Sequence, residues 1–454
     1  MNKARRAFLQ GTAALSAGLI AGGKALATGA DQQTHDMPGM GHDRHKLPPA
    51  KSRQQSVPVT IPMQTPDVPD LPYKMDGDVK VFRLRAEPVE RKLVPFKSMT
   101  VWGYNGSCPG PTMQVQQGDR VRIIFENGLP EATTIHWHGI EVPIEMDGIP
   151  FISQKPVAPG EKFLYEFTLH QEGTFFYHSH SAMQEMMGMI GMFIIHPKNP
   201  YQPHVDHDFG IVLQEWAILP NLDVPNTANM EFNWLTFNGV AAPATTPMIV
   251  RQGNRVRLRI VNLGMDHHPI HLHGHQFYVT GTEGGRAPES TWYPTNTVLV
   301  GVAQAKVVEF EAKFAGDWMV HCHLPHHMMN SMSDLVRDRA IMTADQTAER
   351  AMAQMQTLAK SVPFRHSPPS PVAANANSQP GFPQDAFMEM GMDDAVAKPE
   401  TYGLPPNWSA GMQGMMTLLR ILPDKKYDEI MARVKAGTSN PPMPPMKMDH
   451  DHSS

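Results

Sequence analysis

Residues 117–139, QGDRVRIIFENGLPEATTIHWHG, and residues 252–274, QGNRVRLRIVNLGMDHHPIHLHG, are two copies of one pattern. Each copy starts with Gln-Gly, continues with apolar residues that alternate with charged ones, and ends in His-x-His-Gly. Alternation with a period of two is typical of a strand with one buried face. A further His-x-His follows each copy, as HSH at 178–180 and as HCH at 321–323. A repeat of this length, offset by 135 residues, predicts two tandem β-sandwiches and an all-β fold.

The N-terminus carries the features of an export signal. Basic residues precede a short apolar stretch, and Ala25-Leu26-Ala27 forms an A-x-A cleavage site. The pair Arg5-Arg6 favours the twin-arginine pathway over an ordinary secretory leader. We therefore expect the mature protein in the periplasm.

The remaining chain divides by composition. A stretch rich in His, Met and Pro precedes the repeats. A Met-rich extension that is partly helical or disordered follows them, with short helices expected at 346–361 and 425–436. The expected segments are a signal peptide (1–27), a linker (28–72), a first sandwich (73–200), a second sandwich (201–345) and the extension (346–454).

Composition narrows the function classes. The net charge is -5 and only 18% of residues are charged, which argues against nucleic acid as a partner. No apolar run is long enough to span a bilayer. The 23 His and 33 Met residues are the unusual counts, and imidazole and thioether ligands together favour copper.

The four His-x-His pairs are a candidate metal site. Residues i and i+2 of a strand point to the same face, so each pair presents two imidazoles side by side. Eight imidazoles exceed the four ligands of a structural zinc and suit a cluster of several copper ions. The expected cluster ligands are His136, His138, His178, His180, His271, His273, His321 and His323.

The second repeat also carries a candidate mononuclear site. Cys322 lies between two of the cluster histidines, so its thiol points to the opposite face of the strand. Two His, one Cys and a weak axial Met form a blue-copper electron-transfer site. The candidates are His268, Cys322, His327 and Met332, with His326 and Met328 as neighbouring alternatives. The first repeat has Thr133, Ser179, Gln184 and Met189 at the matching positions, which predicts a single such site, in the second domain.

In these residues the chain resembles the multicopper oxidases. The motifs HWHG, HSH, HxxHLHG and HCHxxxH stand in that family's order, over roughly residues 80–345. The resemblance implies two cupredoxin-like Greek-key sandwiches and four copper ions per chain. His136 and His271 would bind the type 2 ion, the other six cluster histidines the type 3 pair, and the Cys322 site the type 1 ion.

The resemblance also implies an assembly and a mechanism. Only 87 residues separate His180 from His268, which leaves no room for a third sandwich and matches the two-domain subclass. In that subclass the three-copper cluster lies between subunits of a homotrimer. The resemblance therefore implies a homotrimer for this chain, and a cluster within one chain is the alternative. Electrons would enter beside His327 and pass through Cys322, and Asp147 would donate protons unless it is only a turn residue.

The implied activity couples one-electron oxidation of a small reducing substrate to the reduction of O2 to water. The Met-rich segments favour Cu(I) as substrate and a role in copper tolerance, because thioethers prefer Cu(I). Phenols are the alternative substrates, and core filling is the alternative role of the methionines at 183–192. Removal of the extension from Ala386 onward is expected to spare the oxidation of phenols and to weaken copper-stimulated activity. A copper-storage protein and a copper nitrite reductase are the alternative functions.

Overall fold

The structure is a computed structural model of one chain. All described residues belong to one compact unit. The expected signal peptide, Met332 and the expected helix at 346–361 lie outside the described residues. The described residues are 62–181, 183–218, 222–228, 230, 232–328 and 391–437.

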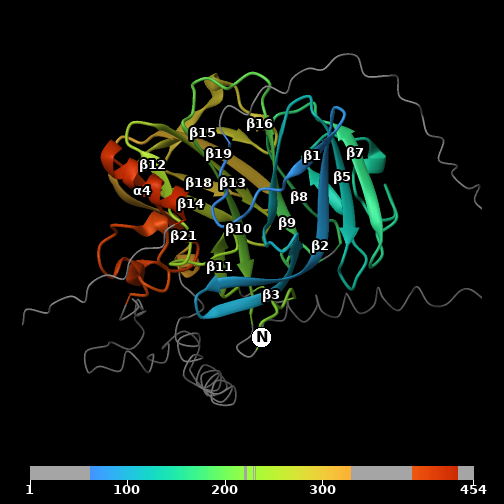
Figure 1. Cartoon of the computed structure of the whole chain (residues 1–454), viewed down its shortest axis with the longest axis horizontal. Helices are drawn as coiled ribbons and strands as arrows, with labels where there is room; N and C mark the ends of the chain where they lie inside the picture. Colours follow the sequence, from blue (N-terminus) through green and yellow to red (C-terminus); the bar gives the residue numbers. More distant parts are fainter. Residues whose placement is uncertain are drawn as a thin grey trace, which may run out of the picture. The chain divides into compact units, whose positions relative to one another are not determined.

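Two sheets form the first sandwich (Figure 1). One sheet has the order β1-β2-β5-β7 with β3 paired to β2, and the other has the order β4-β9-β8-β6. Buried side chains such as Ile123, Trp137 and Phe193 fill the space between them. The strands are β1 (Tyr73–Asp76), β2 (Val79–Val94), β3 (Lys97–Tyr104), β4 (Gly110–Gln116), β5 (Arg120–Asn127), β6 (Ile135–His138), β7 (Lys162–Thr168), β8 (Gly173–Ser179) and β9 (Ile190–His196), with the short helix η1 (Ile144–Met146).

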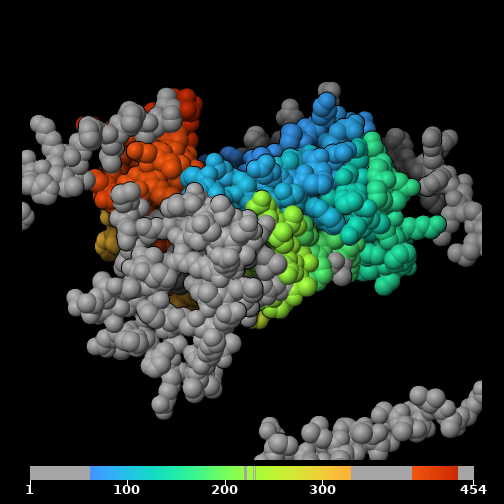
Figure 2. Space-filling model, turned by 90° about the horizontal axis from the view of Figure 1, so that it is seen from below, coloured from blue at the N-terminus to red at the C-terminus, as the bar shows by residue number. Residues whose placement is uncertain are grey.

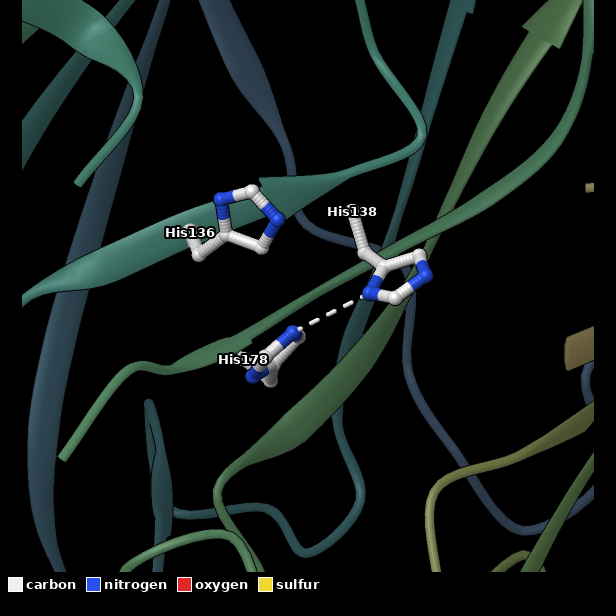
Figure 3. A group of neighbouring side chains, drawn as sticks. All are labelled: His136, His138 and His178. Carbon is white, nitrogen blue, oxygen red and sulfur yellow. Dashed lines mark hydrogen bonds between the residues drawn. The ribbon is translucent and has the colours of Figure 1, made fainter. Parts of the chain in front are cut away.

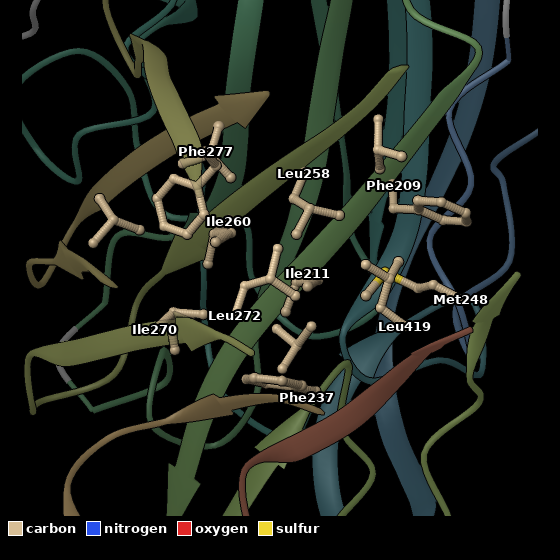
Figure 4. Packing of buried hydrophobic residues seen from close by; sticks show 14 of the residues in the cluster. Phe209, Ile211, Phe237, Met248, Leu258, Ile260, Ile270, Leu272, Phe277 and Leu419 are labelled. Carbon is tan, nitrogen blue, oxygen red and sulfur yellow. The ribbon is translucent and has the colours of Figure 1, made fainter. Parts of the chain in front are cut away.

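The second sandwich repeats this arrangement. Its sheets have the orders β11-β10-β13-β19-β15-β16, with β17 paired to β15, and β12-β21-β20-β14-β18. Figure 4 shows apolar side chains of both sheets, among them Ile211, Leu272 and Leu419, meeting in one core. Its elements up to residue 328 are β10 (His207–Trp216), β11 (Trp234–Phe237), β12 (Met248–Arg251), β13 (Arg255–Asn262), β14 (His268–Leu272), β15 (Phe277–Thr282), β16 (Gly285–Arg286), η2 (Glu289–Thr291), β17 (Tyr293–Thr295), β18 (Thr297–Val300), β19 (Gln304–Glu311), β20 (Gly316–Cys322) and η3 (Pro325–Met328).

The C-terminal segment completes the second sandwich. It contains η4 (Pro399–Thr401), η5 (Trp408–Gly411), β21 (Met416–Leu422) and α4 (Asp424–Ala436). β21 lies between β12, to which it is parallel, and β20, to which it is antiparallel. The sequence boundary at 345 is corrected accordingly, since an apolar strand from the extension belongs to this sandwich. The helix expected at 425–436 is confirmed.

In Figure 2 the C-terminal segment, drawn orange to red, lies next to the N-terminal part of the described chain, drawn blue. An ion pair fixes it there, because Lys398 Nζ lies 2.8 Å from Asp67 Oδ1. Among the described residues, no helix has the length and apolar character needed to cross a membrane.

The four sheets lie in layers. The face of β8 and β9 that carries Phe176, Met192 and Ile194 packs against Val212 and Val261 on the sheet of β10 and β13. The opposite face of that β10–β13 sheet contributes to the core of the second sandwich. The sheet of β14, β20 and β21 is therefore the layer farthest from the first sandwich.

Candidate metal centres

A buried group of two imidazoles and one thiol lies at one end of the second core. His268 begins β14, Cys322 ends β20, and His327 lies in η3. The Sγ atom of Cys322 is 3.7 Å from Nδ1 of His268 and 3.5 Å from Nδ1 of His327, and those two nitrogens are 3.1 Å apart. The three ligand atoms that the sequence predicted for the mononuclear site therefore converge on one point.

Burial without a cation is costly for this group. Desolvation raises the pKa of the Cys322 thiol to about 12 and lowers the pKa of His327 to about 3. A buried thiol becomes a thiolate ligand when a metal ion compensates the charge, and a neutral imidazole offers its lone pair. The donor set of one soft sulfur and two imidazoles fits copper.

Glu215 fixes His268 and was missed in the sequence analysis. Nε2–H of His268 donates to Oε2 of this fully buried carboxylate at 3.1 Å, which leaves Nδ1 as the ligand atom. The same carboxylate accepts hydrogen bonds from the backbone N–H groups of Met265 and Asp266. An acidic residue near the end of the otherwise largely apolar strand β10 was the signal that could have revealed it.

The first repeat contributes four imidazoles, three of which Figure 3 shows. His136 and His138 lie on β6 and His178 on β8, and Nδ1 of His138 is 3.3 Å from Nε2 of His178. Nδ1–H of His136 donates to the carbonyl of Asp147, and Nδ1–H of His178 donates to the carbonyl of Ser179, each at 2.8 Å. The ring centroid of His180 is 5.4 Å from that of His136.

The second repeat contributes the other four imidazoles in a similar arrangement. Nε2 of His273 is 3.0 Å from Nε2 of His321. Nδ1–H of His271 donates to the carbonyl of Asn296 at 2.7 Å, and Nδ1–H of His321 donates to the carbonyl of Cys322 at 2.8 Å. The ring of His323 lies 5.2 Å from that of His321.

These contacts leave unshared ring nitrogens facing one another. Burial, reinforced by neighbouring imidazoles, lowers the pKa of His138 and of His321 to about 4 each, so both rings are neutral at pH 7. The ring nitrogen of His138 faces His178, and that of His321 faces His273. Lone pairs that face each other within such a pair are best satisfied by a cation between them. The residues thus fit copper in both repeats.

The two sets of imidazoles do not meet within one chain. In the described part of the chain, no hydrogen bond or ring contact joins a histidine of the first set to one of the second. The first set shares a face of β6 and β8 with Phe176, which packs against the β10–β13 sheet. The second set lies on the outer face of β14 and β20, because the neighbouring Cys322 points into the second core. The two sheets of the second sandwich lie between them.

Two carboxylates accompany the first set. Oδ1 of Asp147 is 3.4 Å from Nδ1 of His136, where the sequence predicted an acid. Oε1 of Glu185 is 3.0 Å from Nδ1 of His178, and this acid was not predicted. The methionines that follow the first HSH motif are partly core residues, since Met189 and Met192 are buried.

A further group of potential ligands borders the type 1 site. Oxygen and nitrogen atoms of Asp266, His326 and His327 lie within 4.8 Å of one another. Nε2 of His327 is 3.5 Å from Oδ2 of Asp266, is buried, and has no hydrogen-bond partner among the described residues. Burial, and after it the charge of Glu215, raises the pKa of Asp266.

The first sandwich has no such site at the equivalent place. Thr133 Oγ1 lies 3.0 Å from Ser179 Oγ, which donates to Gln184 Oε1 at 2.7 Å. Two hydroxyls and an amide satisfy one another there without a metal.

Known proteins resemble the chain over these regions. Copper resistance protein A of Pseudomonas syringae pv. tomato is 35% identical over 139 residues, which are 31% of this chain and 23% of that protein. Laccase-2 of Botryotinia fuckeliana is 32% identical, over 47% of this chain and 40% of that protein. The matched region thus spans less than half the length of these two relatives.

A solved structure and two family models agree with that result. The blue copper oxidase from Nitrosomonas europaea superposes with a TM-score of 0.52 at 30% identity, over 55% of this chain and 81% of that one. The likeness confirms two cupredoxin-like sandwiches. Family models described as multicopper oxidase match residues 87–200 and 217–340, which together exceed half of the chain. The chain therefore belongs to the multicopper oxidase family, and its cofactor is copper.

Proposed function

We propose that the protein is a periplasmic cuprous oxidase that serves copper tolerance. In one cycle, four Cu(I) ions each lose one electron to give four Cu(II), while one O2 gains four electrons and four protons to give two waters. The similarity to copper resistance protein A and the expected export signal support this role and compartment.

The bound copper ions would supply electron transfer at the type 1 site and O2 reduction at the three-copper cluster. The chain supplies a short path between the two sites. Cys322 is covalently adjacent to His321 and His323, and its carbonyl accepts the hydrogen bond from Nδ1–H of His321. Asp147 stands beside His136, where a carboxyl group could deliver protons to the cluster.

The choice of Cu(I) as substrate rests on one group of side chains, Asp266, His326 and His327. A carboxylate and an exposed imidazole lie next to the buried ring of His327, whose other nitrogen faces Cys322. A cation held there would be in contact with a ligand of the type 1 site. A phenol would gain little from this polar group, since it requires an apolar surface.

Oxygen uptake with Cu(I) and with a phenolic dye tests this proposal. Asp266→Asn should lower kcat/KM for Cu(I) by about tenfold, the low end of the effect of removing a metal-site partner, and leave the dye within about twofold. The control is Glu311→Gln, an exposed acid of β19. An equal loss of kcat/KM for both substrates in Asp266→Asn would reject the assignment of the site. If the unsubstituted, copper-loaded protein turned over neither substrate, the result would indicate copper storage instead.

A homotrimer completes the proposed enzyme. Because the second sandwich separates the two histidine sets of one chain, each set needs its counterpart from another chain. A contact between the first sandwich of one subunit and the second sandwich of the next is head-to-tail, and such contacts form a ring when the rotation between neighbouring subunits closes. The resemblance to the two-domain subclass favours a closed ring of three. The three-copper cluster would then lie at each subunit boundary.

A further inference from the structure

The internal repeat identifies the counterpart of each residue around Cys322. β9 pairs antiparallel with β8 and parallel with β4, and β21 pairs antiparallel with β20 and parallel with β12. In the register of these pairs, His178 faces Ile190 and His321 faces Met416. Since His178 and His321 occupy the same place in the two His-x-His motifs, Met416 corresponds to Ile190. The residues just before them, Met415 and Met189, correspond in the same way.

The backbone hydrogen bonds repeat as well. The N–H of Ser179 donates to the carbonyl of Met189 at 3.2 Å, and the N–H of Cys322 donates to the carbonyl of Met415 at 3.0 Å. The N–H of Met189 donates to the carbonyl of Gln184 at 3.4 Å, and the N–H of Met415 donates to the carbonyl of His327 at 2.9 Å. Met415 is thus bonded through its backbone to two ligands of the type 1 site.

The side chain of Met415 belongs to the correct face. Met415, Leu419 and Ile421 alternate along the strand and share one buried cluster with Cys322. Met416 belongs instead to a second cluster, against which Met328 packs. Met328 is therefore associated with the opposite face of β21.

We propose that Met415, and not Met332, supplies the axial thioether of the type 1 copper. The proposal rests on the type 1 site and not on which substrate is oxidised. Spacing within the second HCH motif points to Met332, but only 10 residues separate β8 from β9, whereas 93 separate β20 from β21. β21, the strand that completes the second sandwich, thus comes much later in the chain than β9 does in the first, and Met415 directly precedes it.

The test compares axial substitutions in the full-length, copper-loaded protein. The axial ligand tunes the reduction potential of such a site. Met415→Leu removes the thioether at similar volume and should raise the potential, whereas Met415→Gln supplies a stronger oxygen donor and should lower it. Met332→Leu is the matched control and should leave the potential unchanged.

The readouts are a redox titration of the blue absorbance and the copper hyperfine splitting in electron paramagnetic resonance. Opposite shifts for the two Met415 variants, with none for Met332→Leu, support the assignment. A shift with Met332→Leu, or an unshifted potential in Met415→Gln, overturns it. Circular dichroism establishes that each variant is folded, and none of these readouts depends on Cu(I) being the substrate.

Discussion

Subunit complementation gives a quantitative test of a cluster shared between chains. His138→Ala removes an imidazole of the first set, and His273→Ala removes one of the second. If the cluster is shared as proposed, trimers of either variant alone contain no intact cluster. In a co-expressed mixture, a site is intact when the first sandwich comes from the His273→Ala chain and the second from the His138→Ala chain. A head-to-tail ring places one such boundary in every mixed trimer, so about one third of the sites there are restored, and about one quarter in an equal mixture overall. A cluster within one chain would give no restored site.

The assay is oxygen uptake with Cu(I) and with a phenolic dye, on trimers purified through a different affinity tag on each variant. Copper content measured on the same samples should rise in parallel with activity. The control mixture combines His138→Ala with His178→Ala, which damage the same set and cannot complement. Activity no higher than that control, in trimers that carry both tags, would refute a cluster between subunits.

Three further outcomes follow from individual contacts. Cys322→Ser should abolish the blue absorbance and turnover while copper analysis still detects the cluster ions, because the cluster imidazoles lie on the other face of the strand; a variant that stays blue would contradict the type 1 assignment. Deletion from Ala386 onward removes β21 and should abolish the type 1 absorbance and phenol oxidation, in place of the sparing expected from sequence; retained blue colour would disprove it. Burial, and after it the charge of Arg259, lowers the pKa of His196 in the folded state to about 4. As pH falls below about 6.5, this residue therefore binds a proton in the unfolded chain before it does so in the folded protein, and the free energy of unfolding decreases. His196→Gln should weaken this decline in denaturant titrations at pH 7 and pH 5, and equal declines in both proteins would contradict the assignment.

The sequence was sufficient to predict the fold class and which candidate ligands lie close together. Histidine pairs in strands place two imidazoles on one face of each strand, and the repeat at a fixed offset predicts two such groups. The structure brings His136, His138, His178 and His180 together, and likewise the four histidines of the second repeat. It also joins Cys322 to two imidazoles. Such local periodicity can be read directly because ligand and strand are encoded in the same few residues.

Pairing between distant segments could not be read in this way. The apolar residues of β21 are compatible with a strand, but nothing local shows that its neighbours are β12 and β20. Glu215 escaped for a related reason, because its partner His268 lies 53 residues away. Spacing within one motif gives no information about a strand that a long insertion separates from that motif.

The late position of β21 has a consequence for biosynthesis. β12 and β20 are neighbours of β21 and not of each other, so the second sandwich stays open until residue 422 has emerged from the ribosome. Until that point the edge of β20 that pairs with β21 lacks this partner, and an unpaired strand edge can recruit foreign strands. A translation product that stops before residue 416 would lack the strand that packs beside Cys322. A chaperone that shields this edge of β20 would protect the chain during the last part of its synthesis.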